Sequence, residues 1–221
     1  ATADLTNDAA NFYSVSSADV SDAQIATVKG QYEFDWMNWP AAWGAPYHDV
    51  DGNGAYDAAV DVPGYPGADQ TVWTVANDVP LIVDANGDST GYLETSASLA
   101  GADAIGIELQ ITLWGYAFGA SDPLGNVIFK KATMNYKGTP DTPDGATMDD
   151  TYFALFSDPD LGNFTDDYVG CDVPLSFGYV YNGNRLDGVF NGIYNLAVPA
   201  AGYDFLQGPK DTYDIDEDED T

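Results

Sequence analysis

Residues 105–116 read Ile-Gly-Ile-Glu-Leu-Gln-Ile-Thr-Leu-Trp-Gly-Tyr, and this stretch gives the clearest indication of the fold. From Ile105 to Leu113 every second position carries isoleucine or leucine, and the positions between them are small or polar. Such an alternation predicts a β-strand that buries one face. The stretch Gly125–Tyr136 is the predicted antiparallel partner. Half of the six bases lie in it or beside it, at Lys130, Lys131 and Lys137.

Shorter apolar or alternating stretches predict further strands along the chain. They are Ile25–Trp36, Thr71–Ala76, Pro80–Val83, Thr151–Ser157, Leu175–Tyr181 and Ile193–Val198. Helical periodicity is limited to Asp22–Lys29. Short strands separated by Gly- and Pro-rich turns predict an all-β fold, an antiparallel, jelly-roll-like β-sandwich with long Asp/Gly-rich metal-binding loops. We expect one sandwich domain at 25–209, an arm or edge strand at 1–24 and an acidic tail at 210–221.

The charge of the chain is extreme. Among 221 residues there are 36 acids and six bases, which gives a formal net charge of −30, and 31 of the acids are aspartate. Such a charge repels nucleic acid and anionic membranes, and it destabilises the folded chain by self-repulsion. The excess of aspartate over glutamate, set beside Gly and Asn, is typical of loops that bind divalent cations. Bound cations would relieve the repulsion.

The stretch Asp49–Asp61 has the oxygen spacing of such a loop. With Asp49 as position 1, oxygen side chains fall at positions 1, 3, 5 and 9, and Gly54 is at position 6, as in the first half of an EF-hand loop. Position 12 is Val60 instead of glutamate, and an acid follows one residue later. The predicted calcium ligands are Asp49, Asp51, Asn53, Asp57 and Asp61. The alternative is a Gly-rich turn, since Asp, Asn and Gly are also common turn residues.

Two more aspartate-rich stretches predict further calcium ions. One repeats the 1, 3, 5 spacing and contains Asp84, Asn86 and Asp88. The other follows the predicted strand Thr151–Ser157 and contains Asp158, Asp160, Asp166, Asp167 and Asp172. Several carboxylates held close together raise one another's pKa, and a bound cation removes that penalty. The alternative is that both stretches are solvated acidic loops.

Other classes of site find little support in the sequence. Cys171 is the only cysteine, so no intrachain disulfide can form, and with His48 as the only histidine a Cys/His zinc site is not expected. A Ser-His-Asp triad would have to use His48, and we expect no enzymatic activity. No run of 18 apolar residues exists, so no membrane insertion is expected. The N-terminus lacks methionine, which is typical of a mature end after removal of a signal peptide or, in the alternative, of an engineered start.

Trp36, Trp39 and Trp43 crowd together just before the first aspartate loop. Tryptophans near a loop can form a platform that binds sugars. They can equally cover the edge of a hydrophobic core, since aromatic side chains bury a large area. A secreted carbohydrate-binding or adhesion module built on this cluster is therefore the alternative function.

A series of short motifs resembles a known domain. In order they are Asp49–Asp61, Leu113-Trp-Gly-Tyr116, Phe156-Ser-Asp-Pro-Asp-Leu-Gly162, Asp166-Asp-Tyr-Val-Gly-Cys-Asp172, Gly178-Tyr-Val-Tyr-Asn182 and Pro199–Pro209. Together they are similar to a domain of large secreted surface proteins of Bacteroidota-like bacteria, many of which use type IX secretion. The resemblance covers residues 45–209 and implies an extracellular, β-rich domain. It implies no catalytic residue.

The expected function combines these features. Segment 211–221 has seven acids in eleven residues, and residues 1–20 form a polar arm; both are candidates for contacts with a neighbouring copy. We expect a calcium-binding structural subunit of an extracellular or cell-surface assembly, a filament or tube formed by head-to-tail self-association. The expected partners are the chain itself and, in the alternative, surface glycans. Nucleic acid is not expected to bind.

Overall fold

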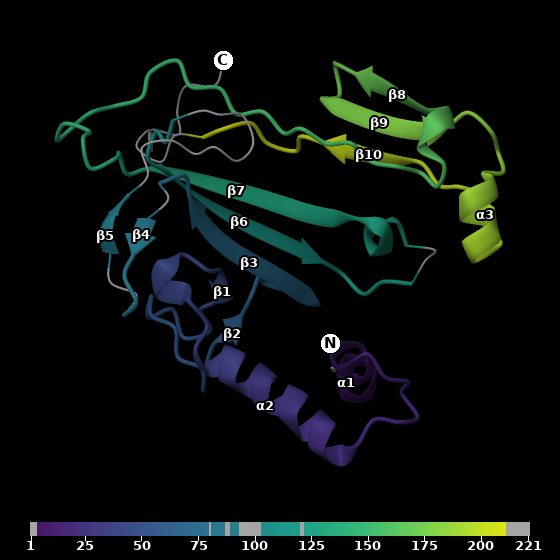
Figure 1. Cartoon of the computed structure of the whole chain (residues 1–221), viewed down its shortest axis with the longest axis horizontal. Helices are drawn as coiled ribbons and strands as arrows, with labels where there is room; N and C mark the ends of the chain where they lie inside the picture. Colours follow the sequence, from purple (N-terminus) through teal and green to yellow (C-terminus); the bar gives the residue numbers. More distant parts are fainter. Residues whose placement is uncertain (1–3, 80, 87–88, 93–102, 120–121, 211–221) are drawn as a thin grey trace. The chain divides into compact units, whose positions relative to one another are not determined.

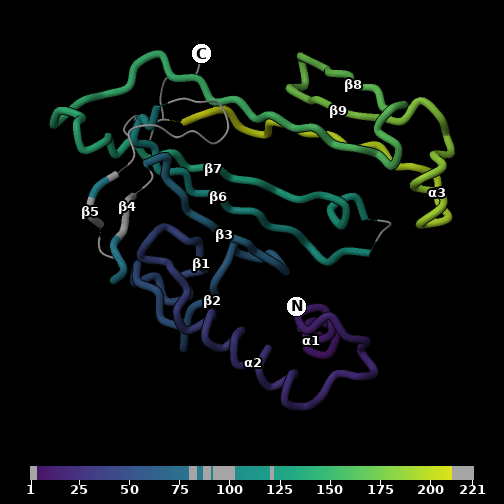
Figure 2. Tube along the Cα trace, viewed as in Figure 1, coloured from purple at the N-terminus to yellow at the C-terminus, as the bar shows by residue number. Residues whose placement is uncertain are grey.

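A computed structural model describes residues 4–79, 81–86, 89–92, 103–119 and 122–210 (Figures 1 and 2). The fold divides into two compact units, Ala1–Asp150 and Thr151–Thr221. We call them unit 1 and unit 2 and describe each by itself. Their boundary falls inside the range 25–209, which was predicted to form one domain.

Unit 1 begins with two helices. Helix α1 spans Leu5–Tyr13, and the Asp4 carboxylate at its start accepts a hydrogen bond from the Asn7 N–H at 3.2 Å. Helix α2 spans Asp22–Met37 and starts with a capping box, in which Ser21 and Gln24 each bond the other's backbone. Such a pair satisfies two N–H groups that a helix end leaves free. The prediction of an edge strand within 1–24 is wrong, because Leu5–Tyr13 is helical.

The prediction of a strand at Ile25–Trp36 is also wrong. The alternation of Tyr32, Phe34 and Trp36 suggested period two, but positions 32 and 36 also share one face of a helix. Phe34 lies away from that face and is 57% exposed. The Trp36 indole N–H donates to the Ala58 carbonyl at 3.1 Å, which ties the end of α2 to the aspartate loop. The helical periodicity at Asp22–Lys29 therefore continues through the aromatic residues to Met37.

The main sheet of unit 1 has the strand order β3-β6-β7 and is antiparallel throughout (Figure 1). Its strands are β3 (Gln70–Asn77), β6 (Ile107–Gly115) and β7 (Ile128–Tyr136). The register places Leu113 between Val72 of β3 and Lys130 of β7. The two long predicted strands and their antiparallel pairing are thus confirmed.

Smaller elements complete unit 1. Two two-stranded antiparallel sheets pair β1 (Tyr47–His48) with β2 (Val62–Pro63) and β4 (Leu81–Val83) with β5 (Ser89–Tyr92). Two short 3-10 helices are η1 (Ala41–Trp43) and η2 (Pro123–Asn126).

The two faces of the main sheet differ in their packing. On one face Trp114 stacks between Tyr65 and Phe129, with ring centroids 3.9 and 5.4 Å apart, and Thr112 is buried. The other face carries the aliphatic residues of β6, and its flanking side chains Val72 and Ile128 are 52% and 76% exposed. The face that the sequence marks as apolar is therefore only partly covered.

Unit 2 contains a three-stranded antiparallel sheet in the order β10-β9-β8, with β8 (Asp167–Asp172), β9 (Phe177–Asn182) and β10 (Ala201–Asp204). A 3-10 helix, η3 (Phe164–Asp166), leads into β8, and helix α3 (Gly188–Tyr194) connects β9 to β10. The strand predicted at Leu175–Tyr181 is confirmed as β9. The strand predicted at Thr151–Ser157 is wrong, since this segment has no regular structure.

The strand predicted at Ile193–Val198 is wrong, because α3 runs into its start. The helix begins at Asp187, whose carboxylate accepts from the Phe190 N–H. A capping aspartate of this kind favours a helix where the apolar residues alone suggested a strand.

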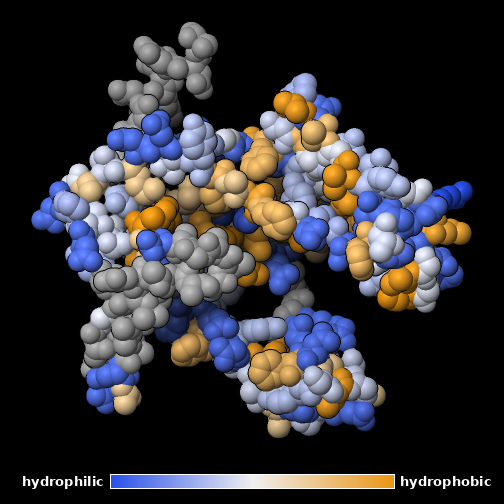
Figure 3. All heavy atoms as spheres, turned by 45° about the horizontal axis from the view of Figure 1, so that its top comes forward, coloured by the Kyte–Doolittle hydropathy of each residue, from blue (hydrophilic) through white to orange (hydrophobic). Residues whose placement is uncertain are grey.

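Antiparallel sheets with little helix make the described chain β-rich, in line with the expected fold class. A jelly-roll-like sandwich and metal-binding loops remain predictions. Helices in the described ranges are all too short or too polar to cross a membrane. The surface carries many apolar side chains, as the orange areas in Figure 3 show.

Candidate metal centre

The first aspartate loop connects β1 to β2. These strands are two residues long each, and the last pair of their register joins His48 to Val62. Because the strands close at that pair, the next residues on either side, Asp49 and Asp61, start and end the loop next to each other. The pairing of the short strands therefore brings together two acids that are twelve positions apart.

Asp49 lies at the centre of the first turn of the loop. Its carboxylate accepts hydrogen bonds from the N–H groups of Gly52, Asn53 and Gly54, at 2.8, 3.1 and 2.8 Å. The two glycines have φ values of 71° and 76°, which side chains with a Cβ rarely adopt. The Gly54 N–H, followed by those of Gly52 and Asn53, keeps the pKa of Asp49 below its ordinary value.

Asp61 closes the loop from inside. It is 2% exposed, and its two oxygens accept from the Val50 N–H at 2.9 Å and the Asp57 N–H at 2.8 Å. A buried carboxylate needs such partners, because an unpaired one would lose its hydration without compensation. Asp61 therefore fixes both arms of the loop.

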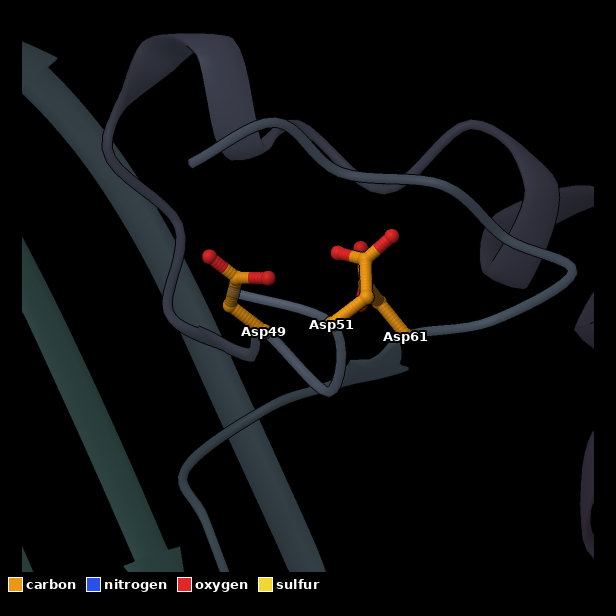
Figure 4. Close-up of side chains that lie close together, drawn as sticks. All are labelled: Asp49, Asp51 and Asp61. Carbon is orange, nitrogen blue, oxygen red and sulfur yellow. The ribbon is translucent and has the colours of Figure 1, made fainter. Parts of the chain in front are cut away.

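Asp51 completes a group of three carboxylates. One oxygen each from Asp49, Asp51 and Asp61 lie within 4.8 Å of one another, and the three side chains point to the same side of the loop (Figure 4). Two oxygens bound to one calcium ion are at most about 5 Å apart, since each bond is about 2.3–2.6 Å long. The spacing is therefore compatible with a single shared cation.

The group has no positive neighbour in the described ranges. None of its three members forms an ion pair there with Lys or Arg. Tyr47, beside the group, shows the effect of this negative charge: partial burial raises its pKa, and Asp49, Asp61 and Asp51 raise it further. A divalent cation is the simplest counter-charge for such a group, and the geometry does not select calcium over other metals.

Two of the five predicted ligands have other roles in the loop. The Asn53 side-chain oxygen accepts from the Ala55 N–H at 2.7 Å, and its NH₂ donates to Asp51 at 2.9 Å. Asp57 accepts from the Ala59 N–H at 2.9 Å and is not a member of the three-carboxylate group. Asn53 thus orients Asp51, while Asp57 stabilises the second turn of the loop.

The second predicted site can be described only in part. Asp84 accepts from the Asn86 N–H at 2.8 Å and from its side-chain NH₂ at 3.4 Å, as in an Asx turn. Asp88 lies outside the described residues.

The third predicted site is spread over several elements of unit 2. Asp166 accepts from the side chains of Asn182 and Asn184, and Asp167 accepts from the Leu161 N–H at 2.8 Å. Asp167 and Asp172 are the two ends of β8, roughly 16 Å apart at the rise of a strand, so one ion cannot bind both.

The remaining two aspartates of that stretch, Asp158 and Asp160, are exposed. Within the described ranges, Asp49, Asp51 and Asp61 are the only group of three or more acids, histidines or cysteines spaced for a metal.

The tryptophan cluster contributes to the position of the aspartate loop. The Trp39 indole N–H donates to the Pro46 carbonyl at 2.8 Å, and that of Trp36 donates to Ala58 at 3.1 Å. Trp43 is 71% exposed. Two of the three tryptophans thus hold the segment before the loop and the second half of the loop itself.

Two structurally important aspartates were not recognised in the sequence. Asp78 accepts from the N–H groups of Ile105, Gly106 and Ile107 and anchors the start of β6. Asp187 is 2% exposed and joins the loop at Asn163 to the start of α3. Only Asp187 had a local signal, its place just before a helix; the partners of Asp78 are 27 to 29 residues away.

No family model, curated protein or solved structure matches this chain. The resemblance to secreted Bacteroidota-like surface proteins therefore stays a prediction.

Proposed function

We propose that this chain is a calcium-binding structural subunit of an extracellular or cell-surface assembly, a filament or tube that grows by head-to-tail self-association. The observation that carries the proposal is the convergence of Asp49, Asp51 and Asp61 on one point of the β1–β2 loop. Backbone N–H groups hold two of the three carboxylates, so the loop itself orients them toward that point.

Calcium fits this donor set better than other common metals. The group offers oxygen only, whereas structural zinc sites use cysteine and histidine. Magnesium requires oxygens at about 2.0–2.1 Å in a nearly ideal octahedron, whereas calcium accepts irregular shells at longer distances. Loops of moderate affinity are filled at the millimolar calcium concentrations outside cells, which agrees with the expected location.

Two features of unit 1 support self-association. Strand β7 pairs with β6 alone, so among the described strands its outer edge has no partner. Such an edge can accept a further strand from another chain. Lys130 and Lys131 lie on this strand in a chain with a net charge of −30, so an acidic segment of a second copy is an electrostatically favourable partner.

The partly covered aliphatic face of the same sheet offers a second contact. It carries Val72 and Ile128, both more than half exposed. A second sheet packed on this face would give the predicted β-sandwich.

The assembly is tested by light scattering and negative-stain microscopy of the full chain in calcium, in magnesium and in EGTA. We expect ordered polymers in calcium and none in EGTA. A chain that stays monomeric in all three conditions, or that polymerises equally in EGTA, contradicts the proposal.

The alternative, a carbohydrate-binding module built on Trp36, Trp39 and Trp43, has weaker support at that cluster. The indoles of Trp36 and Trp39 are engaged with the backbone around the loop, which leaves Trp43 as the most exposed ring. A different aromatic surface is better suited to a sugar.

A further inference from the structure

One face of the unit 2 sheet carries a continuous row of aromatic rings. Tyr168 of β8 lies directly opposite Tyr181 of β9, and Tyr179 and Phe177 follow on β9 at intervals of two residues. Side chains two apart on a strand share a face, so all four rings belong to one surface. Successive ring centroids are 5.9, 6.1 and 5.7 Å apart along the row from Tyr168 to Phe177. We call this surface the tyrosine row.

Three glycines make room for these rings. A Cβ at Gly170 would overlap the ring of Tyr179, one at Gly202 would overlap Phe177, and one at Gly183 would lie 2.6 Å from Tyr168.

None of the three glycines has the positive φ that would require glycine for the backbone. Their role is therefore to leave space, so that the rings of Tyr168, Phe177 and Tyr179 lie against the backbone beside them.

The rings are accessible and their hydroxyl groups are free. Tyr168, Tyr179 and Tyr181 are 57%, 38% and 44% exposed. Within the described part of the chain their hydroxyls form no hydrogen bond, whereas the hydroxyl of Tyr203 accepts one from Ser157. The surface therefore combines flat apolar area with three unused polar groups.

Polar side chains border the row, and none of its own positions is basic. Near Tyr168, the Asn184 side chain donates to Asp166 at 2.7 Å. At the other end Asp204 lies opposite Phe177. The eight strand positions on this face are Tyr168, Gly170, Asp172, Phe177, Tyr179, Tyr181, Gly202 and Asp204. A ligand with carboxylate, sulfate or phosphate groups would be repelled here.

We propose that the tyrosine row binds a neutral glycan chain. A sugar ring presents an apolar C–H face, which can pack on an aromatic ring, and hydroxyls around its edge, which can bond the tyrosine hydroxyls and the bordering amides and carboxylates. An apolar protein surface would instead bury three hydroxyls without partners, which is unfavourable. This site is separate from the aspartate loop and does not depend on the proposed role of calcium.

The test is affinity electrophoresis of the full chain through gels that contain one polysaccharide each. The neutral probes are hydroxyethylcellulose, xylan, glucomannan, laminarin and dextran, and polygalacturonate is the anionic comparison. Runs in calcium and in EGTA separate this site from the metal loop. We expect at least one neutral polysaccharide to retard the chain in both buffers.

The variants locate the binding surface. Tyr181→Ala and Tyr168→Ala should each weaken binding at least about fivefold, the effect of losing one aromatic contact. Tyr181→Phe keeps the ring and should lose less. Tyr152→Ala is the matched control, because Tyr152 is 92% exposed in the same unit and lies outside the sheet. Far-UV circular dichroism checks each variant, and Tyr181→Phe serves as the test if an alanine variant misfolds.

Several results would overturn the proposal. They are the absence of retardation by every neutral polysaccharide, retardation by polygalacturonate alone, and equal binding by Tyr181→Ala and Tyr152→Ala. A change in self-association of Tyr181→Ala, without any glycan binding by the wild type, would identify the row as a protein contact and equally refute it.

Discussion

Replacing Asp51 by asparagine should change the stability of unit 1 in opposite directions with and without calcium. Asp51 is exposed and supports no backbone turn beyond Asn53, so the variant keeps the loop and removes one charge. Its oxygen lies within 4.8 Å of oxygens of Asp49 and Asp61, and in EGTA no cation offsets their mutual repulsion. Two charges at that distance repel by about 1 kcal/mol in a water-like dielectric, and less with added salt. The variant should therefore be more stable than wild type in EGTA.

In calcium the order should reverse. At a calcium concentration about one hundred times Kd, binding to the native state alone adds about 2.7 kcal/mol. If the lost carboxylate weakens binding by about 2 kcal/mol, or roughly thirtyfold, the same calcium adds only about 0.9 kcal/mol. For a unit of this size each kcal/mol changes Tm by about 2–4 °C. The calcium-induced rise in Tm should fall from about 5–11 °C in wild type to about 2–4 °C in the variant.

Differential scanning calorimetry in calcium and in EGTA measures both effects. Asp57→Asn is the matched control, because Asp57 is an exposed acid of the same loop outside the three-carboxylate group. It should retain most of the calcium-induced rise. The assignment of the three ligands would be refuted if calcium raised the Tm of wild type and Asp51→Asn equally. It would also be refuted if Asp57→Asn lost as much of the calcium-induced rise as Asp51→Asn does.

Three further predictions concern other parts of the chain. Asp187→Ala should destabilise unit 2 by about 1–3 kcal/mol, because it leaves partly buried N–H groups at the start of α3 and at Asn163 unpaired. Thermal unfolding measures this change, with the exposed Asp158→Ala as control, and equal effects of the two variants would contradict it. The lowered pKa values of Asp49 and Asp187 should add stability that is complete above the ordinary value of 3.8 and is lost as the pH falls through the folded values. Acid unfolding monitored by circular dichroism should then show that Asp187→Asn loses less stability below pH 3.8 than wild type does. The same dependence of stability on pH in both proteins would rule this out. A chain that ends at Pro209 should fold and bind calcium but polymerise poorly, since it lacks the acidic segment 211–221; turbidity as good as that of the full chain would show that the segment has no role in assembly.

Local patterns in the sequence were sufficient for some elements. The alternation in 105–116 predicted β6, because a strand repeats every two residues and one face is apolar along its whole length. The same reasoning predicted β7 as its antiparallel partner. The spacing of Asp49 and Asp51 marked the candidate loop, because the turn at Gly52–Gly54 is formed by neighbouring residues.

Other features depend on contacts between distant segments. Asp61 was one of five candidate ligands, and only the pairing of His48 with Val62 places it beside Asp49, whereas Asp57 is outside the three-carboxylate group. The spacing of the loop residues is the same whether Asp57 or Asp61 joins the group, so the sequence could not distinguish these two acids.

Helix α2 was predicted only over Asp22–Lys29, and its second half was mistaken for a strand because Tyr32, Phe34 and Trp36 alternate there. Residues two apart share a face in a strand and nearly oppose each other in a helix, so the meaning of the pattern depends on the backbone.

The amino-acid sequence by itself determined the strand pair at the centre of unit 1, the acidic character of the chain and the position of the aspartate loop. Tertiary structure decided which carboxylates meet, which face of the main sheet is covered, and that the rings of Tyr168, Phe177 and Tyr179 lie over glycines. The physical reason is that periodicity and turn chemistry act between near neighbours. The convergence of side chains depends on strand register and on the space that residues of neighbouring strands leave for them. Neither is encoded within a single stretch of sequence.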